Sequence, residues 1–285
     1  MSPGVRVASC QIAPSVERPE RNAELALNTI AGAIDSGAQI VVLPELVNSG
    51  YVFTSVDEAQ AAAVPADGEL LAGWAREAAR GDAVVVGGFC ELAPDGRVHN
   101  SSALVDGGGV RAVYRKLHLW DDEPRWFAPG DQPAPVVETR HGRIGLAVCY
   151  DLEFPELTRG LALAGAELIA LPANWPLDPA PPGGRPILHS LAATTAYLSK
   201  VYVAVCDRCG AERGLEFEGG SVIADPDGGL RAGPVPDHGE RTLLADCDLA
   251  GAREKSSGER NDAFADRRPE YYASALARDH GEGSP

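Results

Sequence analysis

The sequence has few basic residues and no long apolar run, and both absences exclude classes of function. Lys and Arg number 25 against 41 Asp and Glu, so the 285-residue chain has a net charge of −16. Such a surface repels nucleic-acid phosphates and anionic lipid headgroups, so we expect no nucleic-acid and no membrane partner. No stretch approaches the roughly 18 apolar residues of a membrane span, and residues 1–15 (MSPGVRVASCQIAPS) lack the pattern of a signal peptide. We therefore expect a cytoplasmic protein.

Cysteine is also scarce, and its distribution argues against a disulfide framework. The six cysteines are scattered at positions 10, 90, 149, 206, 209 and 247. In a reducing compartment this distribution indicates free thiols. Cys206 and Cys209 form a C-x-x-C pair, but no second pair follows at the spacing of a zinc site. We interpret both as structural and expect no metal.

Apolar strand-like segments alternate with helical ones along most of the chain, and 45% of the residues are hydrophobic. Helices are expected over 21–36, 69–80, 155–164 and 187–199, and strands over 5–13, 39–45, 83–90, 101–106, 110–116, 143–151, 167–173, 201–207, 219–225 and 241–248. Hairpin and crossover connections together favour a mixed sheet with helices outside. We predict one α/β domain over residues 1–277 and a frayed tail over 278–285.

Two of the expected strands end on the same dipeptide. IVVLPE at 40–45 and LIALPA at 168–173 both finish on Leu-Pro. Either two matching halves face each other across one cleft, or the match of so short a motif is a coincidence. The sequence leaves both readings open.

Cys149 ends an apolar strand just before a helix whose first turn holds Pro155 and Glu156. That position is typical of a nucleophile elbow, and an inert, packed cysteine is the alternative. The carboxylates of Asp151, Glu153 and Glu156 nearby would raise the pKa of a thiol, so activation has to come from elsewhere. Asp151 and Glu156 are interpreted as helix-start residues, and the role of Glu153 stays open.

Four residues elsewhere are candidates to activate the thiol. His118, in YRKLHLW, would make a Cys–His pair, although a histidine bonded to backbone is the favoured reading. Glu45 follows Leu-Pro at the end of a wholly apolar strand, Lys116 ends VRAVYRK, and Glu123 lies in DDEPRWFAPGD. Each of these charges, taken alone, also fits a solvated strand end or loop.

Several short motifs in register resemble those of the nitrilase, or carbon–nitrogen hydrolase, superfamily. The motifs are LPEL (43–46), YRKLHL (114–119), DDEPRWFAPGD (121–131), AVCYDLEFPE (147–156), LPANWP (171–176), CDRCGAERG (206–214), GGSVIADPDG (219–228) and DRRPEYY (266–272). The likeness covers nearly the whole chain. One departure is Asp207, which stands where the family usually carries asparagine.

The resemblance implies a catalytic set and a fold. Cys149 would be the nucleophile, Glu45 the general base and Lys116 the group that stabilises the oxyanion, while Glu123 would orient Lys116 or the substrate. The implied fold is a four-layer αββα sandwich, assembled into a homodimer or a larger homo-oligomer. No metal and no organic cofactor are implied.

The order Cys149-Tyr150-Asp151 resembles the amidase branches of the family more than the true nitrilases. The resemblance therefore implies hydrolysis of a small carboxamide to the carboxylic acid and ammonia through a thioester, with neutral aliphatic or simple aromatic amides expected. Nitrile hydrolysis and N-carbamoyl cleavage are alternatives that use the same residues. A non-catalytic scaffold is a further alternative, which would have no need of the catalytic set.

Four residues flank the implied cleft and are expected to bind substrate, although core packing would explain them as well: Tyr51, Tyr150, Asn174 and Trp175. An ω-amidase, which acts on a monoamide of a dicarboxylic acid, would also need a cation in the pocket. Arg125 and Arg185 are the candidates for that cation.

Overall fold

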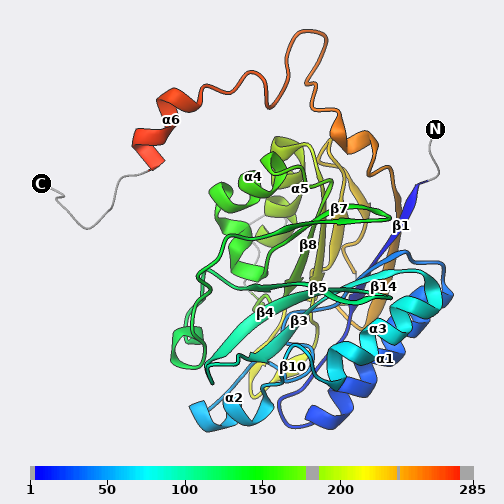
Figure 1. The fold of residues 1–285 in the computed structure, drawn as a ribbon, viewed down its shortest axis with the longest axis vertical. Coiled ribbons are helices and arrows are strands. Elements are labelled where there is room, and N and C mark those ends of the chain that lie inside the picture. Colours follow the sequence, from blue (N-terminus) through cyan, green and yellow to red (C-terminus); the bar gives the residue numbers. More distant parts are fainter. Residues whose placement is uncertain (1–3, 178–185, 236–237, 277–285) are drawn as a thin grey trace, which may run out of the picture. The chain divides into compact units, whose positions relative to one another are not determined.

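Two six-stranded mixed sheets form the centre of the protein, with helices on their outer faces (Figure 1). The computed structural model describes residues 4–177, 186–235 and 238–276, in two units, Met1–Arg253 and Glu254–Pro285. Both sheets belong to the first unit. The helix–sheet–sheet–helix order confirms the α/β four-layer sandwich that the sequence predicts. The single domain over 1–277 stays a prediction, and the expected tail at 278–285 lies outside the described residues.

The strands of each sheet come from one half of the chain, except that the last strand of the chain joins the first sheet. In spatial order, the first sheet consists of β14 (Arg241–Cys247), β1 (Val5–Gln11), β2 (Ile40–Val42), β3 (Val84–Leu92), β4 (Val98–Asp106) and β5 (Gly109–Arg115). The second sheet consists of β13 (Leu230–Ala232), β12 (Val222–Ala224), β9 (Tyr202–Asp207), β8 (Leu168–Ala173), β7 (Gly142–Leu146) and β6 (Val136–Thr139). A separate short ribbon pairs β10 (Ala211–Glu212) with β11 (Leu215–Glu216).

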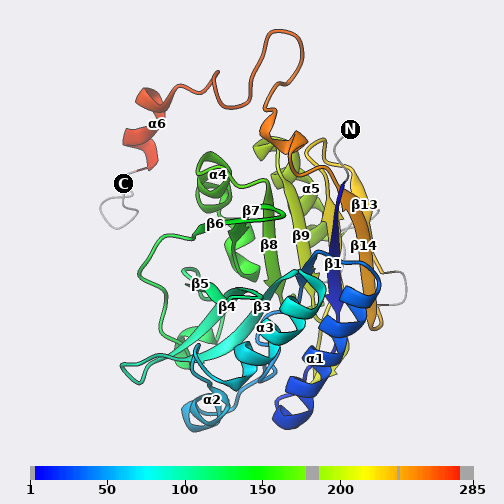
Figure 2. The same ribbon diagram turned by 45° about the vertical axis from the view of Figure 1, so that its right-hand side comes forward.

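The helices cover the two outer faces. Against the first sheet pack α1 (Pro19–Asp35) and α3 (Glu69–Gly81), which lie side by side in Figure 2, and against the second pack α4 (Pro155–Leu163) and α5 (Ile187–Ser199). The remaining helical segments are α2 (Val56–Ala62), α6 (Pro269–Leu276) and the 3₁₀ turns η1 (Glu123–Arg125), η2 (Cys149–Glu153) and η3 (Gly251–Arg253). No helix in the described ranges is both long and apolar enough to cross a bilayer.

The two sheets repeat one pairing pattern. In the first, β1, β2 and β3 run parallel between antiparallel neighbours. In the second, β7, β8 and β9 do the same. β2 and β8 therefore hold equivalent places in two matching halves, and each is followed or ended by the Leu-Pro dipeptide. Ligand sites in such sheets form beyond the carboxyl ends of parallel strands, which places a site near both Leu-Pro ends.

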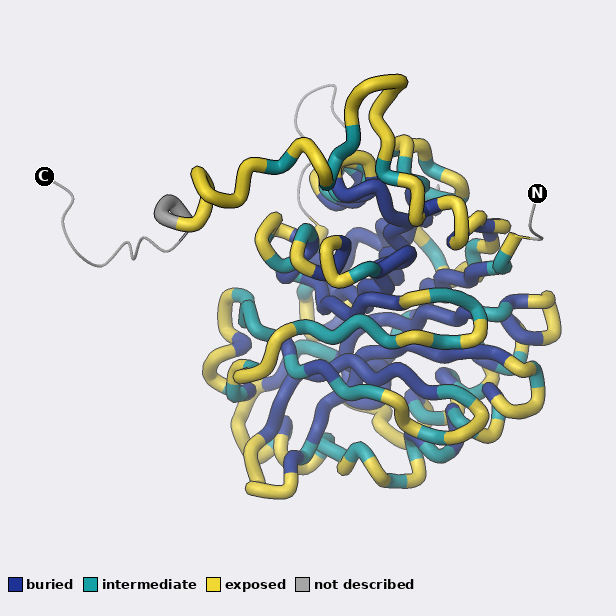
Figure 3. Tube along the Cα trace, turned by 45° about the horizontal axis from the view of Figure 1, so that its top comes forward, coloured by how far each residue is buried: buried dark blue, intermediate teal, exposed yellow. Residues whose placement is uncertain are grey.

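Burial follows this layout. Strands β2 and β8 are buried at every residue, because each is covered by a helix layer on one side and by the other sheet on the other (Figure 3). Such strands read as continuous apolar runs, which is why the sequence reveals them. The sequence analysis missed the polar helix α2 and the short strands β6, β10, β11 and β13. In α2 the Ser55 hydroxyl accepts a hydrogen bond from the Glu58 N–H, so a Ser-x-x-Glu capping pattern was available as a signal.

Candidate active site

Cys149 lies at the first residue of η2, three residues beyond the end of β7. Val148 before it is extended, whereas Cys149 has a φ of 44°, in the left-handed region that only glycine adopts without strain. The sharp turn is the nucleophile-elbow geometry expected from the sequence, and it holds the thiol on a rigid strand end. Only 7% of the residue is exposed.

Lys116 follows β5 directly and is completely buried between two carboxylates. Its Nζ lies 2.8 Å from Glu45 Oε1 and 2.8 Å from Glu123 Oε1. A buried ammonium is tolerated only when it is paired, and two partners meet that condition here. The structure thus brings together three residues that are up to 78 positions apart in the sequence, at the ends of β2 and β5 and in η1.

Glu45 has one oxygen occupied and one free. Oε1 accepts from Lys116 and, at 2.7 Å, from the amide of Asn100 on β4. Oε2 is buried and has no partner within the described parts of the chain. Asn100 was missed by the sequence analysis, because its position depends on the pairing of β4 with β3, where it lies opposite Cys90. A carboxylate oxygen left open beside a thiol is suited to accept its proton.

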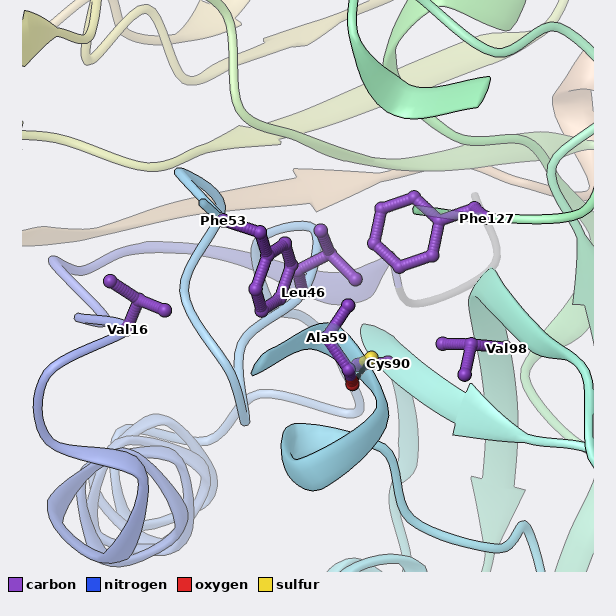
Figure 4. Packing of buried hydrophobic residues seen from close by; sticks show 7 residues of the cluster. All are labelled: Val16, Leu46, Phe53, Ala59, Cys90, Val98 and Phe127. Carbon is purple, nitrogen blue, oxygen red and sulfur yellow. Dashed lines mark hydrogen bonds between the residues drawn. The ribbon is translucent and has the colours of Figure 1, made fainter. Parts of the chain in front are cut away.

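Glu123 uses both of its oxygens. Oε1 accepts from Lys116 and from the Tyr51 hydroxyl at 2.9 Å, and Oε2 accepts from the backbone N–H of Trp120 at 3.2 Å. Leu46, next to Glu45, and Phe127, four residues after Glu123, belong to one apolar cluster. Figure 4 shows this cluster, formed by Val16, Leu46, Phe53, Ala59, Cys90, Val98 and Phe127. The rings of Phe53 and Phe127 meet edge to face, with centroids 5.8 Å apart. This packing fixes both loops and hence both carboxylates.

The charges at this site shift one another's titration. Burial raises the pKa of Cys149 well above its usual value, and Glu45 raises it further, while Lys116 opposes both. For Lys116 burial alone would lower the pKa, but Glu123 and Glu45 outweigh burial and raise it well above its usual value. Lys116 is therefore a permanent cation, and Cys149 is a neutral thiol at rest that must lose its proton during the reaction.

Asp151 is fully buried and does more than start a helix. Its carboxylate accepts from the backbone N–H of Val148 at 2.9 Å, which is the expected helix-start role. It also accepts from the Tyr114 hydroxyl at 2.9 Å and lies 2.7 Å from His118 Nδ1. The expectation that His118 bonds to backbone was thus wrong, because its ring is held by this carboxylate and stacks on Phe154. Together these contacts lock the turn that carries Cys149.

A pocket of about 240 Å³ opens onto Cys149. Three of the four expected substrate-binding residues line it, namely Tyr150, Asn174 and Trp175. Glu153, whose role the sequence left open, lines it too, together with the unexpected Trp120, Pro176 and Ile187. Tyr51 is not among the described lining residues, and its hydroxyl instead supports Glu123. Of the two candidate cations, Arg125 is 64% exposed and bonds to Asp122, while Arg185 lies outside the described residues.

Cys206 and Asp207 are the last residues of β9, and Cys209 follows two residues later; all three are buried. Asp207 accepts from the backbone N–H groups of Trp175 and Gly220, at 2.8 and 2.9 Å. Cys206 and Cys209 are buried free thiols, in line with the structural role expected for them. Among the residues that the structure describes, no group of three or more His, Cys, Asp or Glu side chains is arranged to hold a metal ion.

Comparison with known proteins finds one family and relatives that are named amidases or nitrilases. The carbon–nitrogen hydrolase family matches residues 6–256. A protein named nitrilase from Pyrococcus abyssi is 38% identical over 94% of this chain and 99% of its own, and an (R)-stereoselective amidase from a Pseudomonas species is 38% identical over 71% and 70%. A mutant of the amidase from Nesterenkonia sp. AN1, with the acetamide moiety of fluoroacetamide added to its active-site cysteine, superposes with a TM-score of 0.78 at 28% identity, covering 95% of this chain and 97% of that one.

Proposed function

The chain belongs to the carbon–nitrogen hydrolase family and is an amidase-like hydrolase of carbon–nitrogen bonds, and we propose that it converts a small carboxamide into the carboxylic acid and ammonia through a thioester on Cys149. The observation that carries this proposal is the buried Lys116 between Glu45 and Glu123, next to a strained cysteine at the floor of a pocket. An inert scaffold would have no use for such a costly arrangement.

In the first half-reaction, Cys149 Sγ attacks the amide carbon while Glu45 Oε2 takes the thiol proton. The new C–S bond leaves a negative charge on the carbonyl oxygen, which the ammonium of Lys116 and the backbone N–H of Tyr150 stabilise. Glu45 then gives its proton to the amide nitrogen, the C–N bond breaks, and ammonia leaves. The product is a thioester, with Glu45 ionised again.

In the second half-reaction, water replaces ammonia. Glu45 removes a proton from the water while the water oxygen attacks the thioester carbon. Lys116 and the backbone N–H of Tyr150 again stabilise the oxyanion that forms. The C–S bond breaks, the thiolate regains the proton held by Glu45, and the carboxylic acid departs. Glu123, whose oxygens are all occupied, keeps Lys116 in place through both steps.

Nitrile hydrolysis is the second candidate, because the similar protein from P. abyssi is named a nitrilase. The same thiol, base and cation would serve a nitrile carbon. A panel containing matched amides and nitriles separates the two functions. Release of acid from a nitrile, but from none of the amides, would overturn the amidase assignment.

The decisive experiment combines ammonia detection with mass spectrometry. The protein is mixed with acetamide, butyramide, benzamide and the matching nitriles, and the peptide containing Cys149 is examined for an acyl adduct. We expect ammonia release and an adduct on this peptide. Fluoroacetamide is a useful additional probe, because the active-site cysteine of the Nesterenkonia mutant carries its acetamide moiety.

Two variants control this experiment. Cys149→Ala should abolish both adduct and ammonia release, whereas Cys209→Ala, at another buried thiol, should leave both unchanged. The mechanism fails if Cys149→Ala hydrolyses every active amide at the wild-type rate.

A further inference from the structure

The pocket over Cys149 has walls that are mostly apolar and a single formal charge. Trp120, Tyr150, Trp175, Pro176 and Ile187 supply aromatic and aliphatic surface. Among the described lining residues none is Lys, Arg or His, and Glu153 is the one carboxylate. The acyl group of a substrate would therefore meet a hydrophobic enclosure with negative charge at one place.

Glu153 differs from the other carboxylates near the site because none of the described residues pairs with it. Asp151 is held by Tyr114 and His118, and Glu45 and Glu123 share Lys116. Glu153 makes no hydrogen bond or ion pair with the described residues, and it is exposed, although partial burial raises the pKa of its carboxyl group. An accessible carboxylate on the pocket wall without a counter-charge attracts a cation.

Asn174 supplies a second, independent pointer on the same pocket. Its side chain is buried, with 1% of the residue exposed, and neither Oδ1 nor Nδ2 has a partner in the described part of the chain. Its backbone N–H lowers the pKa of Cys149, against the effect of burial, and both residues line the same pocket. A buried amide with both ends unmatched indicates a ligand that supplies polar atoms near the scissile carbonyl.

We propose that the acyl part of the substrate carries a protonated amine, paired with Glu153 and donating to Asn174 Oδ1, so that the substrate class is small amino carboxamides such as the amides of amino acids. This inference rests on the proposed amidase function. It replaces the neutral amide expected from the sequence and disfavours the ω-amidase alternative, because a substrate carboxylate would face Glu153 with no described cation to balance it. The net charge of −16 also favours the approach of a cation.

The test compares near-isosteric amides that differ in charge. Alaninamide and isobutyramide differ by an ammonium in place of a methyl group, and succinamate adds an anionic member. At pH 7, kcat/KM should be about fivefold higher for alaninamide than for isobutyramide, as one solvent-accessible charge pair provides. Succinamate should be the poorest of the three.

Substitutions locate the preference. Glu153→Gln should remove most of the alaninamide advantage, measured as the ratio of kcat/KM for alaninamide to kcat/KM for isobutyramide. Glu153→Lys should invert the order and admit succinamate. Asn174→Leu, which keeps the branched shape and removes the polar atoms, should lower kcat/KM for alaninamide more than for isobutyramide. Glu156→Gln is the matched control, since that exposed carboxylate does not line the pocket, and it should leave the ratio unchanged.

The outcomes distinguish a wrong substrate class from a wrong amidase function. If isobutyramide and alaninamide are hydrolysed equally well, or if Glu153→Gln leaves their ratio unchanged, the inference is wrong while the amidase function stands. If no amide is hydrolysed and Cys149 takes up no acyl group, the proposed function itself fails.

Discussion

The two glutamates that flank Lys116 differ in how many of their carboxylate oxygens already accept hydrogen bonds. Glu123 has both oxygens engaged, by Lys116, Tyr51 and the Trp120 backbone. Glu45 keeps Oε2 free among the described residues. Two carboxylates that share one lysine are thereby suited to different work, proton transfer for Glu45 and positioning for Glu123.

Replacing Glu45 by Gln tests this division at the scale of the residue. Gln keeps an acceptor for Asn100 and Lys116 but cannot carry a proton, so kcat should fall by about 10²–10⁴-fold, the usual contribution of a general base. Steady-state kinetics on the best amide, with a thermal melt to show intact folding, measures the effect. His118→Ala is the comparison. A Cys–His mechanism would be supported if that variant were inactive while Glu45→Gln kept its activity.

Elements position these residues through close backbone approach. The loop after β2 lies directly on β3, where the N–H of Gly88 bonds to the carbonyl of Pro44 and the N–H of Val47 bonds to the carbonyl of Gly88. A side chain at position 88 would place its Cβ 2.4 Å from the Cα of Glu45. Glycine on β3 is therefore what allows the base to sit where it does.

Gly88→Ala should consequently damage both stability and activity. Overpacking of this kind costs about 1–3 kcal/mol, and a displacement of Glu45 by about 1 Å can reduce turnover about 10²-fold. Urea unfolding and kcat are measured together. Gly32→Ala is the control, because a Cβ on that exposed residue of α1 meets nothing within 4 Å, and it should be neutral or slightly stabilising. Equal behaviour of the two variants would contradict the packing argument.

At the scale of the whole molecule, the site forms where two matching half-sandwiches meet. Glu45 and Lys116 follow strands of the first sheet, and Cys149 and Asn174 follow strands of the second. Asp207, at the end of β9, ties the chain after β8 to the chain before β12 through two backbone hydrogen bonds. Three large apolar side chains of α5, Ile187, Tyr197 and Leu198, are exposed. The homo-oligomer expected from the family resemblance stays a prediction.

Asp207 should make global stability depend on pH. Burial raises its pKa from the ordinary 3.8 to about 7, with Glu218 and Glu45 adding to the effect against two backbone hydrogen bonds. The unfolded chain then loses this proton at lower pH than the folded one, so stability falls as the pH rises from about 4 to about 7. Relative to Asp207→Asn, the wild type should lose at most roughly 4 kcal/mol over that window.

Urea unfolding of both proteins at several pH values measures this difference. The Asn variant serves as its own reference, since any cost of altered hydrogen bonding is present at every pH. A difference in unfolding free energy that stays constant between pH 4 and pH 7 would show that Asp207 titrates normally.

The residues themselves determined much of this protein. Buried strands such as β2 and β8 are recognisable in the sequence as apolar runs, and the extent of helices such as α5 is clear from the sequence. The motifs around Glu45, Lys116 and Cys149 carry the family resemblance. The polar α2 and the two- to four-residue strands escaped because their local signals are weak and their stability comes from neighbours. Only the tertiary structure decided that Asp151 holds His118, that Asn100 holds Glu45 and that Tyr51 supports Glu123. It also decided that Glu153 lines the pocket with no partner among the residues that the structure describes. Most of these contacts join residues that are far apart in the chain. They depend on strand register and on close packing, and a local sequence pattern encodes neither of these.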